Sequence, residues 1–196
     1  MLSELVRKHA RVFLEPVARF ISWTGLSPNV ITIIGFVLMI GVAFVLAWGH
    51  FLVGGILITG VALFDAVDGT LARMMGRTSR FGAFLDSTLD RFSEAVIFLG
   101  LFIYFVGQNQ SLELILIYAT VVGSLMVSYA RARAEGIGVP LKDGLFTRFE
   151  RVFLLVIGLI FDQLTVTLWL LAIFSNLTAI QRMYLVWRIT GGEKGG

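Results

Sequence analysis

Six runs of mainly apolar residues follow one another along the chain, separated by short polar or glycine-containing segments. A transmembrane helix needs about 20 largely apolar residues, and every run reaches that length except the shorter one at 146–161. The pattern therefore predicts an all-α integral membrane protein with six transmembrane helices. We expect them at residues 29–48, 51–74, 83–106, 112–132, 146–161 and 164–187.

The composition agrees with a membrane protein and excludes several kinds of site. Hydrophobic residues make up 57% of the chain and charged residues only 15%, whereas a soluble domain is about half apolar and a quarter charged. The chain has no cysteine, which excludes disulfides, thiolate metal sites and a thiol nucleophile. Its net charge of +3 fits an anionic membrane surface or a phosphorylated substrate better than nucleic acid.

Positive charge is segregated to one side of the predicted topology. All 16 lysines and arginines precede the first helix, surround the second and fourth connections, or lie near or beyond the C-terminal end of the sixth helix. The other connections, at residues 49–50, 107–111 and 162–163, contain none. Lysine and arginine favour the cytoplasmic face, so the sequence predicts a multi-pass protein of the cell membrane with both termini in the cytoplasm.

The two ends of the chain differ from its apolar middle. Residues 1–22 carry apolar and basic residues on different faces of a helix that Pro16 interrupts. This pattern predicts an amphipathic juxtamembrane helix on the membrane surface, with a plain linker as the alternative. Residues 23–190 form the predicted six-helix transmembrane domain, and the glycine-rich tail at 191–196 is expected to be disordered.

Four aspartates lie near the ends of the second and third predicted helices. Asp65 and Asp68 are spaced i, i+3 and Asp86 and Asp90 are spaced i, i+4, so each pair shares one helix face. The short connection predicts that the two helices are antiparallel neighbours, which brings both pairs to one depth. An aspartate at the middle of a span costs about 2.5–3.5 kcal/mol, so the cluster requires a compensating partner.

Divalent cations would offset the charge of these aspartates. Carboxylate oxygens without histidine or cysteine suit a hard ion such as Mg²⁺, Mn²⁺ or Ca²⁺, and four carboxylates suffice for two metals about 4 Å apart. On spacing alone, a proton relay or a buried ion-pair network with Arg73 and Arg91 is the alternative.

The residues around the aspartates form a longer pattern. The chain reads Asp65-x2-Asp68-Gly69-x2-Ala72-Arg73-x8-Gly82-x3-Asp86-x3-Asp90. This resembles the signature of the CDP-alcohol phosphotransferase family at every position of the pattern. The resemblance implies that Asp65, Asp68, Asp86 and Asp90 hold two Mg²⁺ ions, with Mn²⁺ as an alternative, and that Asp90 is also the general base.

The same resemblance implies a binding site for a CDP-linked lipid. Gly69, Ala72 and Gly82 have little bulk, so a nucleotide can approach the helices closely, and Arg73 is a cation that suits a phosphate. Helix capping is the alternative role for the polar residues at the start of the first span. The implied CDP-lipid-binding residues are Asn29, Thr32, Asp68, Gly69, Ala72, Arg73, Ser79 and Gly82.

A second basic region lies along the fourth to sixth predicted helices. Its arginines could converge on one anion, and arginine forks suit phosphate. The segments at residues 128–136, 147–151 and 176–182 resemble those of phosphatidylinositol phosphate synthases and related archaeal lipid enzymes. The acceptor of these enzymes is inositol phosphate, and lysine is common in them at the position of Arg131. The alternative is that the arginines set the topology or snorkel to the interface. The candidate acceptor-phosphate-binding residues are Arg131, Arg148, Arg151 and Arg182.

Together these features predict an integral-membrane phosphatidyltransferase with a cytoplasmic active site. It would transfer the phosphatidyl group of CDP-diacylglycerol to a hydroxyl of inositol phosphate and release CMP. Glycerol 3-phosphate is the alternative acceptor, an archaeal-type lipid is the alternative donor, and a cation or proton transporter is the alternative from another class. By resemblance we expect a homodimer surrounded by membrane lipids, with no nucleic-acid partner.

Overall fold

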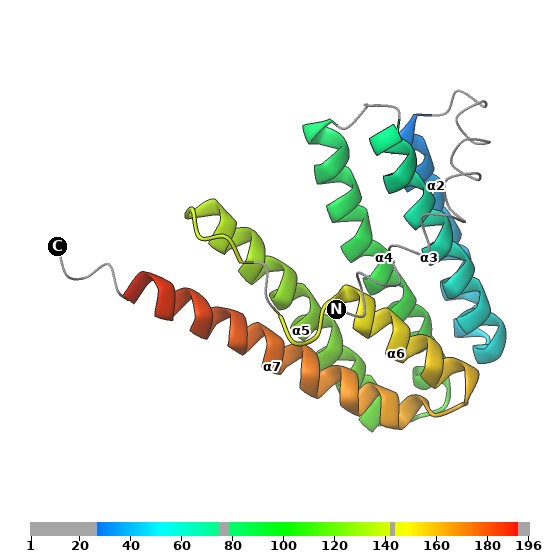
Figure 1. The fold of residues 1–196 in the computed structure, drawn as a ribbon. Helices are drawn as coiled ribbons and strands as arrows, with labels where there is room; N and C mark the ends of the chain where they lie inside the picture. The colour runs from blue at the N-terminus through cyan, green and yellow to red at the C-terminus, as the bar shows by residue number, and fades with distance from the viewer. Residues whose placement is uncertain (1–26, 75–78, 142–143, 192–196) are drawn as a thin grey trace.

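The computed structural model describes residues 27–74, 79–141 and 144–191, without the side chains of residues 64–74. These residues form an all-α structure, as predicted (Figure 1). The helices are α2 (Pro28–Ala47), α3 (Phe51–Met74), α4 (Arg80–Gly107), α5 (Ser111–Gly136), α6 (Arg148–Ile160) and α7 (Leu164–Gly191). Each coincides within a few residues with one of the expected apolar runs. The predicted juxtamembrane helix at 1–22 and residues 192–196 of the expected tail lie outside the described residues.

Tight turns join the helices at one end of the structure. Gly49, between α2 and α3, has a φ of 81°, and Asn109 and Asp162 have φ values of 57° and 55° in the α4–α5 and α6–α7 turns. Glycine adopts this left-handed region without strain, and asparagine and aspartate tolerate it better than most residues. The turns therefore define three antiparallel pairs, α2 with α3, α4 with α5 and α6 with α7.

The helices contact one another in a closed ring. α2 packs against α3 and α4, α4 against α5, α5 against α7, α7 against α6, and α6 against α3. The sequence predicted that α3 and α4 pack directly on each other because their connection is short. Among the described residues, both helices instead make extensive contacts with α2. Buried apolar side chains such as Leu46, Ile58, Phe98 and Leu168 form the core.

Small residues allow two of these helix contacts to be close. A Cβ atom added at Gly100 of α4 would collide with the backbone of Ala43 in α2. Gly123 of α5 lies against Asn176 of α7, whose Nδ2 donates to the carbonyl oxygen of Ala119 at 2.9 Å. Small residues and side-chain hydrogen bonds at helix contacts are typical of membrane proteins, so the local packing agrees with the apolar composition.

The outer surface of the ring is apolar. Large hydrophobic side chains are exposed on each described helix, among them Phe44, Ile56, Phe102, Ile115 and Phe153. Contiguous apolar surface of this kind marks a region covered by lipid or protein. In the described part of the chain, α2, α5 and α7 are long and apolar enough to cross a membrane. The structure is thus that of a membrane-embedded protein, while the count of six spans stays a prediction.

We expect Gly100→Ala to destabilise the protein, because the new methyl group would push α2 and α4 apart. Overpacking of a well-packed contact costs about 1–3 kcal/mol, so the midpoint of thermal unfolding in detergent should fall. Gly41→Ala is the control, because a Cβ atom there meets nothing within 4 Å and alanine favours a helix. A midpoint for Gly100→Ala equal to or above that of Gly41→Ala would contradict the close contact.

Candidate active site

α6 is much shorter than the helices around it, and this creates a recess inside the ring. Its 13 residues span about 20 Å, whereas the hydrocarbon core of a bilayer is about 30 Å thick. Figure 1 shows that α6 begins part-way along the length of α4. The first turn of α6 therefore carries Arg148 and Arg151 toward the interior of the ring.

A cavity of about 520 Å³ opens between α4, α5, the start of α6 and α7. It brings together both of the predicted metal-binding aspartates whose side chains are described, and all four of the predicted acceptor arginines. The polar residues that line it are Asp86, Ser87, Asp90, Arg91, Glu94, Ser128, Arg131, Glu135, Thr147, Arg148, Arg151 and Arg182.

Asp86 and Asp90 form an acidic wall of this cavity, one helical turn apart on α4. Asp86 is exposed and Asp90 is half-buried. Asp65 and Asp68 belong to α3, but their side chains are not described. Within the described ranges, no three histidine, cysteine, aspartate or glutamate side chains are grouped as metal ligands. The predicted four-aspartate metal centre therefore stays a prediction.

Arg148 meets Asp90 from the first turn of α6. Its Nη1 lies 2.8 Å from Asp90 Oδ2, while its Nε is buried and has no hydrogen-bond partner in the described part of the chain. A buried donor without a partner is costly. Arg148 thus combines an ion pair with Asp90 and a buried donor that no described residue satisfies.

Arg151 and Arg182 are buried in the wall of the cavity. Arg151 forms a two-point ion pair with Glu94, with distances of 2.7 Å from Nε to Oε1 and 2.9 Å from Nη2 to Oε2. Arg182 donates from Nη1 to the carbonyl oxygen of Val127 at 2.6 Å. A Cβ atom added at Gly144 would lie 2.8 Å from Nη2 of Arg182, so the loop before α6 passes close to this guanidinium.

Arg131 lies at the exposed rim of the cavity on α5. Its Nε is 2.8 Å from Oε1 of Glu135 one turn later, and the exposed fractions of the two side chains are 50% and 51%. An exposed ion pair of this kind contributes little to stability. Arg131 can therefore exchange its interaction with Glu135 for one with a ligand at low energetic cost.

A capping box fixes the first turn of α6, which carries two of these arginines. Thr147 is the N-cap residue. The Glu150 carboxylate accepts from the Thr147 backbone N–H at 2.9 Å and also from the Thr147 hydroxyl group. The motif satisfies polar groups at the helix start. Because Arg148 and Arg151 lie in this turn, the cap also sets the position from which they enter the cavity.

Part of the predicted CDP-lipid site gathers where α2 and α4 begin. Ser79 caps α4 and its hydroxyl accepts from the Gly82 backbone N–H at 2.8 Å. A Cβ atom added at Gly82 would lie 2.9 Å from Asn29 Oδ1 and 3.0 Å from Ser79 Oγ, so the three residues are close together. Thr32 lies one turn after Asn29 on α2. Nothing is described of the side chains of Asp68, Ala72 and Arg73 or of the surroundings of Gly69, all on α3.

The capping alternative, made for the polar residues at the start of the first span, does not describe Asn29. The cap of α2 is Ser27, whose hydroxyl accepts from the Val30 backbone N–H at 3.4 Å. The Thr32 hydroxyl donates to the Pro28 carbonyl oxygen at 3.1 Å, within the same helix. The helix start therefore does not need the Asn29 side chain as its cap, and this side chain lies instead beside Gly82.

Glu94 is a site residue that sequence reasoning missed. It follows Asp86 and Asp90 at the same spacing of four residues, so the three acids form one stripe along α4. The spacing is a signal that could have identified it, but Glu94 lies outside the family pattern and beside an apolar run. Its partner Arg151 is 57 residues away in the chain, so the fold is needed to show the pair.

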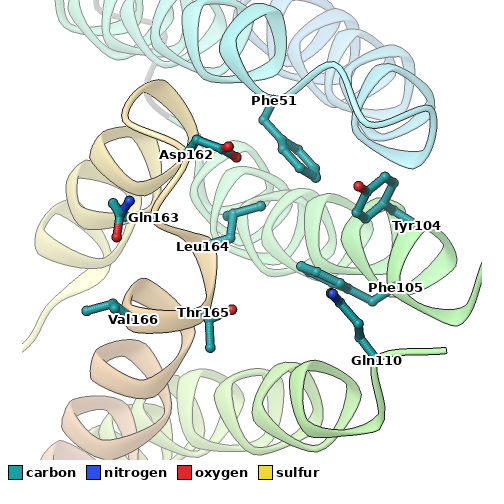
Figure 2. Close-up of a pocket in the computed structure, with 9 residues that line it drawn as sticks. All are labelled: Phe51, Tyr104, Phe105, Gln110, Asp162, Gln163, Leu164, Thr165 and Val166. Carbon is teal, nitrogen blue, oxygen red and sulfur yellow. The ribbon is translucent and has the colours of Figure 1, made fainter. Parts of the chain in front are cut away.

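A second cavity, of about 230 Å³, lies among the turns at the opposite end of the helices (Figure 2). Phe51, Tyr104 and Phe105 make edge-to-face contacts there, with ring centroids 4.8 Å and 5.2 Å apart. Among the described residues that line it, Asp162 is the single charged side chain. Because this lining has no arginine or lysine to balance a phosphate, the polar cavity on α4 is the better candidate for the active site.

Comparison with known proteins identifies the family. The chain matches the model of the CDP-alcohol phosphatidyltransferase family over residues 25–187. An archaetidylinositol phosphate synthase of Pyrococcus horikoshii is 36% identical over 185 residues, which cover 94% of this chain and 95% of the relative. A phosphatidylinositol phosphate synthase of Streptomyces avermitilis is 38% identical over 204 residues, covering 94% of this chain and 83% of the relative.

Solved structures share the fold. The crystal structure of a Mycobacterium tuberculosis phosphatidylinositol phosphate synthase with CDP-DAG bound has a TM-score of 0.84 and 33% sequence identity, over 89% of this chain and 93% of that chain. The same synthase in complex with manganese and citrate has a TM-score of 0.83 and 34% identity, over 89% of this chain and 88% of that chain. The chain therefore belongs to the CDP-alcohol phosphatidyltransferases, enzymes of membrane phospholipid synthesis.

Proposed function

We propose that the protein transfers the phosphatidyl group of CDP-diacylglycerol to a hydroxyl group of inositol phosphate and releases CMP. One observation carries this proposal: the polar cavity combines two aspartates of the family pattern with a set of arginines from three helices. An acceptor that carries its own phosphate needs such cations, whereas a neutral acceptor does not. The arginines are Arg131, Arg148, Arg151 and Arg182. The names of the relatives support the same acceptor class.

The aspartates supply suitable donors for divalent cations. Asp86 and Asp90 offer oxygens one turn apart on a cavity wall whose described lining has no histidine or cysteine, which suits Mg²⁺ or Mn²⁺. Asp65 and Asp68 would complete the set. Two such ions would neutralise the diphosphate and make CMP a better leaving group. A related synthase has been solved in complex with manganese, which supports this choice.

The starts of α2 and α4 provide the proposed site for the cytidine diphosphate. Asn29 and Ser79 place polar oxygens beside Gly82, where the absence of a side chain lets a nucleotide approach. Thr32, Asp68, Gly69, Ala72 and Arg73 would form the remainder of this site. An apolar cavity of about 330 Å³ between α2, α3, α4 and α6 adjoins the polar one, so the lipid part of the donor would approach from that side.

Asp90 is the proposed general base. Its carboxylate accepts the proton of an acceptor hydroxyl group, and the acceptor oxygen attacks the phosphorus bonded to the lipid oxygen. The bond from this phosphorus to the oxygen bridging to the second phosphorus breaks, so CMP departs and the phosphatidyl group is joined to the acceptor. Arg148, whose Nη1 is 2.8 Å from Asp90 in this structure, would also contact the acceptor phosphate and thereby keep the acceptor close to the base.

Charge segregation in the sequence supports a cytoplasmic position for this cavity. A nucleotide and a phosphorylated acceptor are soluble in water, whereas acyl chains stay in the bilayer. A cavity at the cytoplasmic interface would therefore serve both substrates. We also propose that the protein is a homodimer, as the family resemblance implies.

The proposed reaction is tested by measuring CMP release from CDP-diacylglycerol by the purified protein. With Mg²⁺, inositol phosphate should support release, whereas unphosphorylated inositol and serine should not. Removal of divalent ions with EDTA should abolish release, and added Mg²⁺ or Mn²⁺ should restore it, because the diphosphate charge must be balanced. If glycerol 3-phosphate is the one acceptor that supports CMP release, the alternative acceptor is established. If none of the tested acceptors supports CMP release, the proposal is overturned.

We expect Asp90→Asn to lower kcat by roughly 10²–10⁴-fold, as the loss of a general base does. Binding of CDP-diacylglycerol, measured by calorimetry, should persist in part because Asp65, Asp68 and Asp86 would remain as metal ligands. Asp162→Asn is the control, because Asp162 is exposed at the opposite end of the helices. Near-normal turnover of the Asp90 variant would refute its assignment as the base.

We expect Arg131→Ala to raise the KM for inositol phosphate about tenfold, because a charge-assisted contact to the phosphate is lost. The KM for CDP-diacylglycerol should stay within about twofold, and folding should be unaffected because the Arg131–Glu135 pair is exposed. Arg133→Ala is the matched control, since Arg133 is an exposed arginine of the same helix that does not line the cavity. An equal rise in both KM values would argue against a separate acceptor-phosphate pocket.

A further inference from the structure

The Glu94–Arg151 ion pair bridges two helices that make little other contact. Glu94 is on α4 and Arg151 on α6, and these helices are not among the pairs that pack extensively in the described part of the chain. The exposed fractions of the two residues are 9% for Glu94 and 3% for Arg151. Both carboxylate oxygens of Glu94 are used, one by Nε and one by Nη2 of the guanidinium. The geometry therefore holds the guanidinium at two points.

Stability alone is a weak reason for this pair. Removing two charges from water costs free energy that their attraction only partly repays, and apolar replacements of similar size are often as stable. The cost is larger in a membrane-embedded bundle. A pair that contributes little net stability, yet lies in the wall of the active-site cavity, is better explained by what it does to the cavity.

The pair leaves part of the Arg151 guanidinium available to a ligand. A guanidinium has five N–H donors. Glu94 accepts from Nε and Nη2, and the Phe146 carbonyl oxygen accepts from Nη1 at 3.4 Å. One N–H on each of Nη1 and Nη2 therefore remains for a ligand in the cavity that Arg151 lines. Two such donors match two oxygens of a phosphate.

Glu94 also lies on the boundary between two cavities. It lines the polar cavity of about 520 Å³ and the apolar cavity of about 330 Å³. Without the carboxylate, the Arg151 guanidinium would lose the contact that holds it on the polar side. Because Glu94 lies on this boundary, the orientation of the Arg151 guanidinium toward the polar cavity depends on Glu94.

We propose that Glu94 is a positioning residue, which orients the Arg151 guanidinium so that its remaining N–H donors bind the phosphate of the acceptor. This inference rests on the proposed function, because it assumes an acceptor phosphate in the polar cavity. Glu94 itself touches neither substrate. Its effect on the reaction passes through Arg151, so it appears in the affinity for the acceptor and not in the affinity for the CDP-linked lipid.

Glu94→Gln tests the inference, because glutamine keeps the shape of the side chain but loses the charge and one of the two acceptor oxygens. We expect the KM for inositol phosphate to rise about tenfold, with kcat and the KM for CDP-diacylglycerol within about twofold of wild type. Glu113→Gln is the matched control. Glu113 is also a buried acid, but it lies on α5 and accepts from the Thr165 hydroxyl at 2.9 Å. We expect it to leave both KM values unchanged.

A merely structural role for Glu94 predicts a different result. In that case the midpoint of thermal unfolding would fall, and the two KM values would either rise together or both stay unchanged. Either result for the KM values would overturn the inference. Glu94→Asp provides a second variant should Glu94→Gln not fold, because it retains the charge but moves the carboxylate back by one methylene group. We expect an intermediate rise in the KM for the acceptor alone.

A double variant establishes whether Glu94 acts through Arg151. In an Arg151→Met background, adding Glu94→Gln should not raise the KM for the acceptor further, whereas independent effects would multiply. The choice of acceptor in the assay separates this inference from the proposed function. If wild-type protein releases CMP with glycerol 3-phosphate in place of inositol phosphate, the proposed acceptor is wrong. The same variants measured with glycerol 3-phosphate still support or overturn the role of Glu94.

Discussion

The rest of the site depends on the pairing of arginines with acids between α4 and α6. Arg148 meets Asp90 and Arg151 meets Glu94, about one helical turn deeper. Inside a membrane-embedded bundle a lone charge is costly, so a cation is tolerated there when a counter-charge accompanies it. The two pairs thus allow a polar cavity of about 520 Å³ to exist within an apolar ring of helices. They also bridge helices whose backbones do not pack closely, which keeps the cavity between them open.

The two ends of the ring accommodate buried charge in different ways. At the polar cavity, acids and arginines are interleaved. At the opposite end, Glu113 is buried in the first turn of α5, where the Thr165 hydroxyl donates to it from the first turn of α7. Helix N-termini favour negative charge, so this acid is stabilised by two helix starts and a hydroxyl group. The absence of lysine and arginine from the connections at this end is therefore compatible with a buried acid.

The sequence predicted the positions of the described helices better than the contacts between them. Apolar runs located each described helix to within a few residues, because burial in lipid imposes a long and uniform pattern. The four arginines line one cavity, while their role in binding the acceptor phosphate stays a proposal. The central place of α2 between α3 and α4 and the partner of Glu94 were not predictable in this way. Both are long-range packing relations, and periodicity within one helix reports which face is buried but not what covers it.

The three acids on α4 differ in burial, and in our proposal they differ in role accordingly. Asp86 is exposed, Asp90 is half-buried and Glu94 is buried. A ligand of a hydrated cation must be reachable from water, and a base must touch the acceptor hydroxyl while remaining ionised. An acid that orients an arginine functions best where water cannot compete for either partner, since electrostatic interactions strengthen as the surroundings become less polar. In our proposal these requirements are met in this order from the mouth of the cavity inward. The spacing of four residues keeps all three acids on one face, so the short α6 needs to supply only Arg148 and Arg151 to match the two deeper acids.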